Sequence, residues 1–225
     1  MLTLNPQTCT VEDKMDALEL WWLDQAVYRE IRERHYSLRC INVRPGIIET
    51  ANGFVLHQVV GKHNSTSGTY IVDCYKKVTK SRKSHTVALF DGKTNFPDTD
   101  RITTPVISNA NWILSIAKSE LLWALDMPDA LTCILVISAH GFAVKHNSIA
   151  AYLPFKVLTQ PAPLEGADKP AKLRIAVDPK FLTAAANLPT GDDVLLSFID
   201  ATHPIVVQST DSRYRAIVMP MHLGR

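Results

Sequence analysis

The sequence contains few of the residues on which common catalytic sites depend. Only nine of its 225 residues are glycine, although phosphate-binding loops and tight nucleotide-site turns need glycine. The serine-hydrolase pattern GxSxG and the zinc-protease pattern HExxH are both absent. His140 and His146 have neither metal-ligand spacing nor nearby acids, so we predict strand-surface positions for both. The sequence therefore predicts a protein that is not an enzyme and that holds no metal or cofactor.

Cysteine pairs and long apolar runs are also missing. The four cysteines, Cys9, Cys40, Cys74 and Cys133, form no CxxC pair and lie mostly within apolar segments, as reduced core thiols of cytosolic proteins do. No segment approaches the roughly 20 apolar residues that span a bilayer, and no N-terminal stretch combines a basic start with an apolar run. We therefore expect a cytoplasmic protein without a membrane partner. Its 46% hydrophobic content is enough for a core, and its net charge of +2 indicates no particular partner.

The second half of the chain repeats one pattern of elements. Apolar residues at helical spacing predict a helix from Asn111 to Leu125, and three strand-like runs follow it. After a proline-rich linker the order recurs, with a second helix that has Asp178 as its N-cap and Pro179 at its first position. The predicted strands cover residues 131–137, 141–147, 149–158, 172–177, 193–200, 204–210 and 214–220. This recurrence predicts an internal duplication, with two helices on one face of antiparallel sheets in an α+β fold.

The first half is less regular. We expect a long helix from Val11 to Arg34, with Trp21 and Trp22 available as interface anchors. Strands are expected at residues 37–43, 53–60 and 85–92, with a turn at "ANG" after "GIIET" and another strand that begins at Thr69. A short helix is expected after the strand that begins at Thr69. The domain boundary is placed near Asn95, which gives an incomplete, divergent domain over residues 1–95 and a second domain over residues 96–225.

Three segments resemble the bacterial sliding clamp, the β subunit of DNA polymerase III. The terminus "YRAIVMPMHL" is similar to the closing strand and MPMRL ending of that family, with His222 in the usual arginine position. The linker "DGKTNFPDTDRI" is similar to the family's DG-x-FPDY-x-R-V segment, with Thr99 in place of the tyrosine. A turn from Asp200 to Pro204 matches the family's D-x-x-x-P turn, and "ETANGFVLHQVV" more weakly resembles its ATDGHRL strand-turn-strand.

The resemblance implies a DNA-clamp fold built from repeated β-α-β-β-β units. Clamps of this family close as rings around duplex DNA, and the chain length fits the two-domain clamps that close as trimers better than the dimeric three-domain form. We therefore expect a homo-oligomer, with a trimer favoured and a dimer as the alternative. Its partners would be duplex DNA, bound without sequence preference, and short peptide motifs of DNA polymerase and clamp-loader proteins.

The resemblance also assigns a peptide-binding pocket. Its residues, carried over by matching position, are Ile217, Val218, Met219, Pro220, Met221 and Leu223 from the terminus, Pro97, Arg101 and Ile102 from the linker, and Gly53, Phe54, Val55 and Leu56 as the facing wall. Methionine is unbranched and polarizable, so a Met-rich groove can accept several related peptides. The alternative is that Val218 and Met219 are ordinary core residues of the last strand.

A basic run, "YKKVTKSRKSH", contains the candidate DNA contacts. These are Lys76, Lys77, Lys80, Arg82 and Lys83, with Lys118 and Lys180 as weaker candidates on the predicted helices of the second domain. Basic helices that touch phosphates give salt-sensitive, sequence-independent binding. The alternative is a solvated loop. Besides the processivity clamp, two hypotheses stay open: an adaptor or decoy that kept the pocket but not the ring, and a structural scaffold whose terminus matches by chance.

Overall fold

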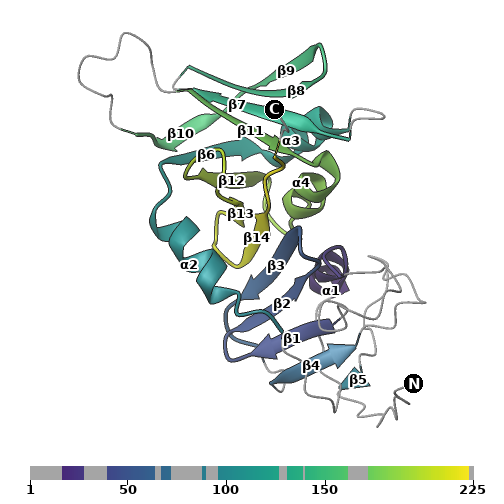
Figure 1. Ribbon diagram of the computed structural model, residues 1–225. Coiled ribbons are helices and arrows are strands. Elements are labelled where there is room, and N and C mark those ends of the chain that lie inside the picture. The colour runs from purple at the N-terminus through teal and green to yellow at the C-terminus, as the bar shows by residue number, and fades with distance from the viewer. Residues whose placement is uncertain are drawn as a thin grey trace. The chain divides into compact units, whose positions relative to one another are not determined.

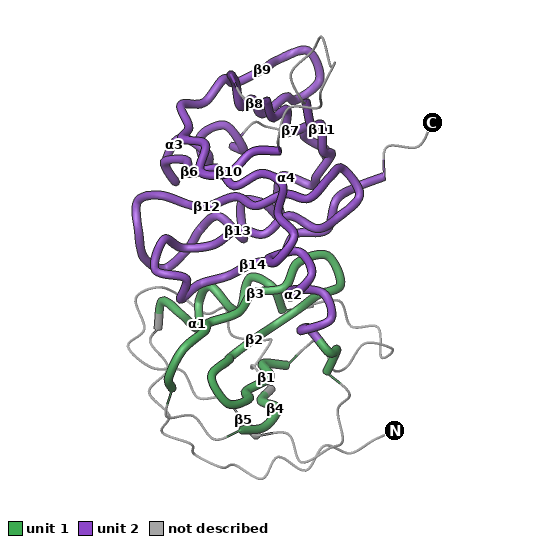
Figure 2. Tube along the Cα trace, turned by 90° about the vertical axis from the view of Figure 1, so that its left-hand side faces the viewer, with its two compact units in different colours: residues 1–98 green, residues 99–225 purple. Residues whose placement is uncertain are grey.

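The computed structural model describes residues 17–27, 40–63, 67–71, 88–89, 96–126, 131–138, 140–161 and 172–222. The chain divides into two compact units, unit 1 (Met1–Asp98) and unit 2 (Thr99–Arg225), which Figure 2 shows in different colours. The division falls between Asp98 and Thr99, whereas the sequence analysis placed it near Asn95.

Unit 2 is built from two antiparallel sheets (Figure 1). One sheet has the order β10-β6-β12-β13-β14, in which the strands are Lys156–Thr159, Trp112–Ala117, Asp193–Phe198, Ile205–Ser209 and Tyr214–Val218. The other has the order β11-β7-β8-β9, in which they are Lys172–Val177, Cys133–Ser138, Gly141–His146 and Ile149–Leu153. The strands of both sheets alternate buried and more exposed residues over part of their length, as sheets with one face on a core do.

The strand pairing in unit 2 confirms the predicted duplication. Each copy consists of a strand, a helix and three more strands, and each copy contributes its first strand to the sheet of the other copy. Thus β6 pairs with β12 from Ala117 opposite Asp193, and β11 pairs with β7 from Val177 opposite Cys133. In both pairs the last residue of the first strand meets the first residue of its partner. Such matching registers are expected when one supersecondary unit occurs twice.

The two helices of the duplication lie next to each other. Helix α3 (Lys118–Leu125) packs on β6 and β9, and α4 (Pro179–Ala186) packs on β13 and β14. As predicted, Asp178 is the N-cap of α4: its side chain accepts a hydrogen bond of 2.8 Å from the backbone N–H of Lys180, and Pro179 takes the first helical position. The antiparallel sheets and their helices confirm the predicted α+β class.

Two predictions about local structure in unit 2 are wrong. The segment expected to be one helix from Asn111 to Leu125 is a strand up to Ala117 and a helix only from Lys118. In β6 every second side chain is buried, beginning with Trp112, so the segment has the two-residue period of a strand. Likewise, residues 149–158 form two strands interrupted at Pro154, because β10 pairs with β6 in the other sheet.

A helix follows the linker, in a segment for which the sequence analysis predicted no element. Helix α2 spans Asp100–Ser108 and contains Pro105. Thr103 and Val106 are its buried side chains, and the helix packs on β12 and β13. The neighbouring turn at Asp200 has the hydrogen bonds expected of an aspartate turn: its Oδ1 accepts from the backbone N–H groups of Thr202 and His203. The side chain of His203 also bonds this oxygen and, as the first cause, holds the pKa of Asp200 well below its usual range.

Unit 1 has one antiparallel sheet among its described residues. Its order is β3-β2-β1-β4-β5, in which the strands are Val55–Val60, Ile47–Ala51, Cys40–Arg44, Gly68–Ile71 and Ala88–Leu89. The first four strands repeat the arrangement β9-β8-β7-β11 of unit 2, including the antiparallel pairing of the strand that follows the sheet's three-strand meander. Unit 1 therefore contains, in its described part, one copy of the four-strand arrangement that unit 2 contains twice.

Helix α1 of unit 1 is shorter than predicted. It spans Ala17–Asp24 and packs on β2 and β3, whereas the sequence analysis extended it to Arg34. Residues 25–27 form a turn, and the remaining predicted ends of the helix lie outside the described residues. The proposed interface anchor Trp22 is fully buried, so its role is in the core of unit 1. The short helix expected after β4 also lies outside the described residues.

Candidate peptide-binding surface

The C-terminal segment is fastened to the body of unit 2. Its three residues Met219, Pro220 and Met221 directly follow β14. The backbone N–H of Met221 donates a hydrogen bond of 2.8 Å to the carbonyl oxygen of Ala176 in β11, and the hydroxyl of Thr132 lies 3.6 Å from its sulfur. The segment is therefore held at both ends, by the strand before it and by this hydrogen bond after it. Leu223 lies outside the described residues.

The segment changes from buried to exposed within three residues. Ile217 and Val218 are core residues of β14, with 2% and 0% of their surface exposed. Met219 and Met221 expose 41% and 40%, and Pro220 is half-buried. Two flexible apolar side chains are thus presented to solvent on a fixed backbone. Such exposed apolar groups on an ordered segment suit the binding of an apolar peptide.

The linker residues assigned to the pocket lie at the start of α2. Pro97, Arg101 and Ile102 are exposed, and Ile102 shows 42% of its surface. The helix begins with the carbonyl oxygen of Thr99, which accepts from the N–H groups of Ile102 and Thr103 at 3.0 and 2.9 Å. Since α2 packs on β12 and β13 while Met221 bonds to β11, the two segments contact different strands of unit 2.

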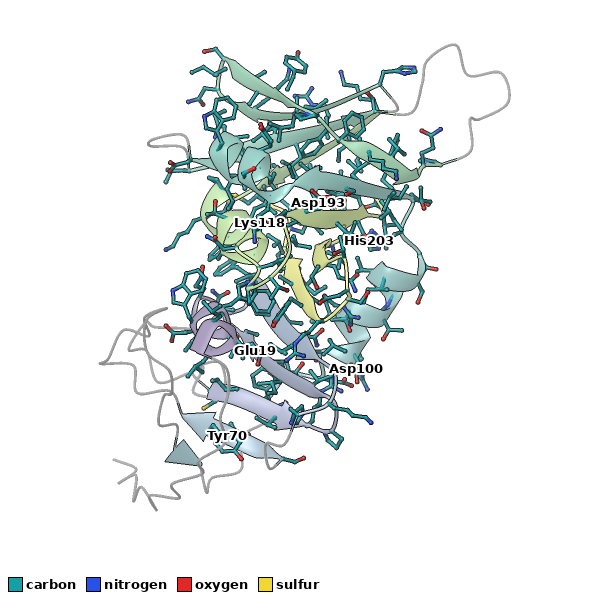
Figure 3. The ribbon with its side chains drawn as sticks, turned by 180° about the vertical axis from the view of Figure 1, so that it is seen from behind. Glu19, Tyr70, Asp100, Lys118, Asp193 and His203 are labelled. Carbon is teal, nitrogen blue, oxygen red and sulfur yellow. The ribbon has the colours of Figure 1, made fainter. Side chains whose placement is uncertain are left out.

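Electrostatics connect α2 with the last strand. Burial lowers the pKa of Arg215 in β14, and the nearby carboxylate of Asp100 in α2 opposes this effect. Asp100, the first residue of α2, is labelled in Figure 3. The attraction between Asp100 and Arg215 thus acts between the start of α2 and β14, the strand that precedes the exposed methionines.

The residues assigned to the facing wall form the turn between β2 and β3 in unit 1. The side-chain oxygen of Asn52 accepts from the backbone N–H groups of Phe54 and Val55, both at 2.9 Å. Gly53 has φ +90°, a conformation that glycine adopts without strain. These constraints fix the turn and leave Phe54 56% exposed, whereas Val55 and Leu56 are buried at 3% and 5%.

Of the candidate DNA contacts, Lys118 and Lys180 lie within the described residues. Lys180 is exposed on α4. Lys118, labelled in Figure 3, begins α3. Its Nζ donates a hydrogen bond of 3.2 Å to the carbonyl oxygen of Leu188, just after α4. Glu120 and Asp126 are also exposed at α3, so acidic and basic groups are mixed on this helical layer. Lys76, Lys77, Lys80, Arg82 and Lys83 lie outside the described residues.

Two buried histidines bond the carbonyl ends of helices, and sequence analysis missed both. His57 Nδ1 lies 2.8 Å from the carbonyl oxygen of Trp22 in α1, and its ring stacks on the indole at 4.3 Å between centroids and 11° between planes. Burial lowers the pKa of His57 to about 4. His146 Nε2 lies 3.0 Å from the carbonyl oxygen of Ala124 in α3. His146 is 3% exposed, so its predicted place on a strand surface is wrong, whereas His140 is exposed as predicted.

No group of three or more potential metal ligands, and no helix long and apolar enough to cross a membrane, occurs in the part of the chain that the structure describes. The described cysteines, Cys40 and Cys133, are free and buried. Burial, helped by the charge of Asp178, raises the pKa of Cys133 to about 12. The thiol of Cys133 is therefore protonated and unreactive at neutral pH.

Taken together, the duplicated strand-helix-three-strand unit, the exchanged first strands and the paired helices define the architecture of a clamp domain. Solved structures that share this fold include DNA polymerase III β subunits, the bacterial sliding clamps. The β subunit from Eubacterium rectale superposes with a TM-score of 0.68 at 12% identity, over 93% of this chain and 65% of that one. The one from Thermotoga maritima gives 0.65 at 16%, over 93% and 65%. A Bartonella birtlesii clamp bound to griselimycin gives 0.62 at 16%, again over 93% and 65%.

The chain thus has the clamp fold and spans about 65% of the length of these clamps. At identities of 12% to 16% the likeness defines the fold alone. No protein-family model matches the sequence, and no curated protein matches it.

Proposed function

We propose that the chain is a non-enzymatic, cytoplasmic sliding clamp that acts in DNA replication. In this proposal it encircles duplex DNA as a homo-oligomeric ring and tethers DNA polymerase and clamp-loader proteins through peptide motifs. Residues 1–95 act as a divergent clamp-like domain and residues 96–225 as the C-terminal clamp domain. The observation that carries the proposal is the clamp architecture of unit 2 combined with its ordered, exposed Met219–Met221 segment.

Within unit 2, the proposed peptide site comprises the terminal segment and the start of α2. The exposed groups Met219, Met221 and Ile102 supply the apolar contacts, and buried Ile217 and Val218 support them from within β14. Arg101 supplies a positive charge at the rim. In unit 1, exposed Phe54 of the turn between β2 and β3 is a further candidate peptide contact, and buried Val55 and Leu56 support that turn. The Asn52 hydrogen bonds favour this role, because a turn that is already ordered loses little entropy when a peptide binds.

A titration with a peptide carrying a QLxLF-type motif tests the proposal. We expect micromolar binding, and a loss of ~1 to 3 kcal/mol for Met219→Ala or Met221→Ala, as is usual when an anchor contact is removed. Leu158→Ala is the matched control, because Leu158 is similarly exposed, at 47%, on the distant strand β10. Undiminished binding in both methionine variants would refute this location for the site.

The second candidate function is an adaptor or decoy that binds clamp-interacting peptides without forming a ring. The exposed acids Glu120 and Asp126 favour it, because acidic groups on the helical layer repel phosphates. Light scattering after size exclusion, over a range of concentrations, separates the two candidates. A closed oligomer that retains circular DNA but releases it once the DNA is linearised supports the clamp. A persistent monomer that still binds the peptide supports the adaptor.

A further inference from the structure

The sulfur-containing side chains of the described residues fall into two groups. Cys40 and Cys133 are free thiols, and both side chains are fully buried. Met219 and Met221 are thioethers that expose 41% and 40% of their surfaces. Hydroperoxides oxidise the sulfur atoms that they can reach, thiols in the form of thiolates and thioethers as neutral sulfides. Within the described residues, the two methionines are therefore the sulfur groups that are accessible to oxidation.

Oxidation at this position would change the surface of unit 2 and leave its core intact. Met219 directly follows β14, and the backbone N–H of Met221 bonds the carbonyl oxygen of Ala176. Neither connection involves a sulfur atom. The buried side chains of Ile217 and Val218 lie before the segment and contain no group that a peroxide attacks. The backbone would therefore keep its place when a methionine becomes a sulfoxide.

The two thioethers differ in one contact. The hydroxyl of Thr132 donates a hydrogen bond of 3.6 Å to the sulfur of Met221, and no such donor lies at the sulfur of Met219 among the described residues. This bond engages a sulfur lone pair, and a lone pair is what attacks a peroxide. Since the exposed fractions of the two side chains are nearly equal, we expect Met219 to be oxidised faster than Met221.

We propose that Met219 and Met221 form a reversible oxidation site that switches off peptide binding. This inference rests on the proposed function, since it assigns a regulation to the same surface. In the forward step a sulfur lone pair attacks the outer oxygen of a hydroperoxide. An S–O bond forms, the O–O bond breaks, and the proton of the transferred oxygen moves to the leaving oxygen, which departs as an alcohol or as water. The sulfur loses two electrons and the peroxide gains them.

A sulfoxide does not suit a surface that an apolar peptide has to cover. Its oxygen is a strong hydrogen-bond acceptor that water satisfies while the site is empty. Apolar side chains of a peptide would displace this water and supply no donor, and a buried polar group without a partner is costly. We therefore expect each sulfoxide to weaken peptide binding by about tenfold or more. A methionine sulfoxide reductase reverses the step with two electrons from a pair of thiols, which become a disulfide while water is released.

Mass-spectrometric mapping after treatment with hydrogen peroxide tests the oxidation site without any peptide. We expect Met219 in the folded chain to gain oxygen at a rate within about threefold of the urea-unfolded chain, because oxidation follows exposure. Met221 should react more slowly, and Thr132→Val should raise its rate towards that of Met219, because valine keeps the shape and removes the donor. Rates at both methionines more than about tenfold below those of the unfolded chain would overturn the site. An unchanged Met221 rate in Thr132→Val would refute the role of this hydroxyl.

Titration with the QLxLF-type peptide before and after peroxide tests the regulation. A thiol reductant added after the peroxide restores oxidised cysteines but not sulfoxides, and thermal unfolding checks the fold. We expect wild type to lose affinity on oxidation and to regain it after treatment with a methionine sulfoxide reductase.

The matched control combines Met219→Leu with Met221→Leu, which keeps two apolar side chains of similar volume and every other methionine and cysteine of the chain. Each protein is compared with itself, and the affinity of this variant should not change on oxidation. Equal affinities of reduced and oxidised wild type would overturn the inference and leave the proposed function intact, as would an equal loss in the variant. Failure of the unoxidised wild type to bind the peptide would instead refute the proposed peptide site, and its regulation with it.

Discussion

The backbone N–H of Met221 donates to the carbonyl oxygen of Ala176 over 2.8 Å, which fastens the end of the described chain to β11. This hydrogen bond holds the backbone of the segment while the side chains of Met219 and Met221 stay exposed, which the proposed peptide site requires.

Removing this hydrogen bond should weaken peptide binding beyond the loss of the side chain. Met221→Ala removes the thioether and keeps the backbone N–H, whereas Met221→Pro removes both. A single hydrogen bond contributes about 0.5 to 1.5 kcal/mol, so we expect Met221→Pro to bind the peptide more weakly than Met221→Ala by an amount in this range. Calorimetric titration measures the difference, and thermal unfolding checks the fold. Equal affinities for the two variants would mean that the docked backbone has no part in binding.

Acid should destabilise unit 1 through His57. The pKa of this buried imidazole is lowered to about 4, while an unfolded histidine titrates near 6.5. The unfolded chain therefore takes up the proton first, so stability is complete above pH 6.5 and falls as the pH drops towards 4. Between pH 7 and pH 5 we expect a loss of ~2 kcal/mol, measured by urea unfolding.

His57→Phe separates this titration from other acid effects. The variant keeps an aromatic ring beside Trp22 and has no group that titrates. It is expected to be less stable than wild type at pH 7, because the carbonyl oxygen of Trp22 loses its partner, and to show a shallower decline towards pH 5. His140→Phe is the control, since His140 is exposed in the turn before β8 of unit 2. If the pH profiles of wild type and His57→Phe are parallel, His57 is not the source of the acid sensitivity.

Elements with a strong local signal were predictable from sequence, and elements that depend on their neighbours were not. The N-cap Asp178 followed by Pro179 fixes the start of α4 by local chemistry alone. By contrast, β6 passes into α3 between Ala117 and Lys118 without a turn residue, and its isoleucines also fit a helical stripe. Pairing with β12 makes this segment a strand, and that partner lies far away in the sequence.

The candidate site likewise contains residues that a local motif identifies and residues that only a distant contact identifies. The exposed methionines could be found because their motif is contiguous. The contact of His57 with Trp22 could not be found, since the two residues are 35 positions apart and meet only when α1 packs on β3. His146 was misplaced for the same reason: a histidine in a strand has no local signal that it will bond a helix end in the core.

Unit 1 should depend strongly on one buried carboxylate. Glu49 in β2 is 1% exposed and accepts from Asn42 Nδ2, Arg44 Nε and Gln58 Nε2 at 2.9 to 3.0 Å. Glu49→Ala would leave buried Gln58, half-buried Asn42 and the charge of Arg44 without this acceptor. We expect a loss of ~3 to 5 kcal/mol in urea unfolding.

Glu49→Gln is the matched variant, because it keeps the shape and one acceptor oxygen. Its loss should be smaller, and Arg44→Met in the Glu49→Ala background should restore part of the stability, since it removes the charge that Glu49 balanced. A Glu49→Ala variant within about 0.5 kcal/mol of wild type would contradict the importance of the cluster.

The salt dependence of DNA binding should separate the basic run from the lysines of unit 2. Each phosphate contact contributes about 0.9 to the slope of log affinity against log salt concentration. If Lys76, Lys80 and Lys83 touch phosphates, replacing all three by alanine should reduce that slope by about 2 to 3. An unchanged slope would mean that the basic run does not contact phosphates.

Lys118→Ala is the contrasting variant. Because the Nζ of Lys118 already bonds the carbonyl oxygen of Leu188, we expect lower stability and an unaltered slope for this variant. A reduced slope in Lys118→Ala without loss of stability would instead mean that this lysine leaves Leu188 to bind phosphate, and that the helical layer of unit 2 faces DNA despite its exposed acids.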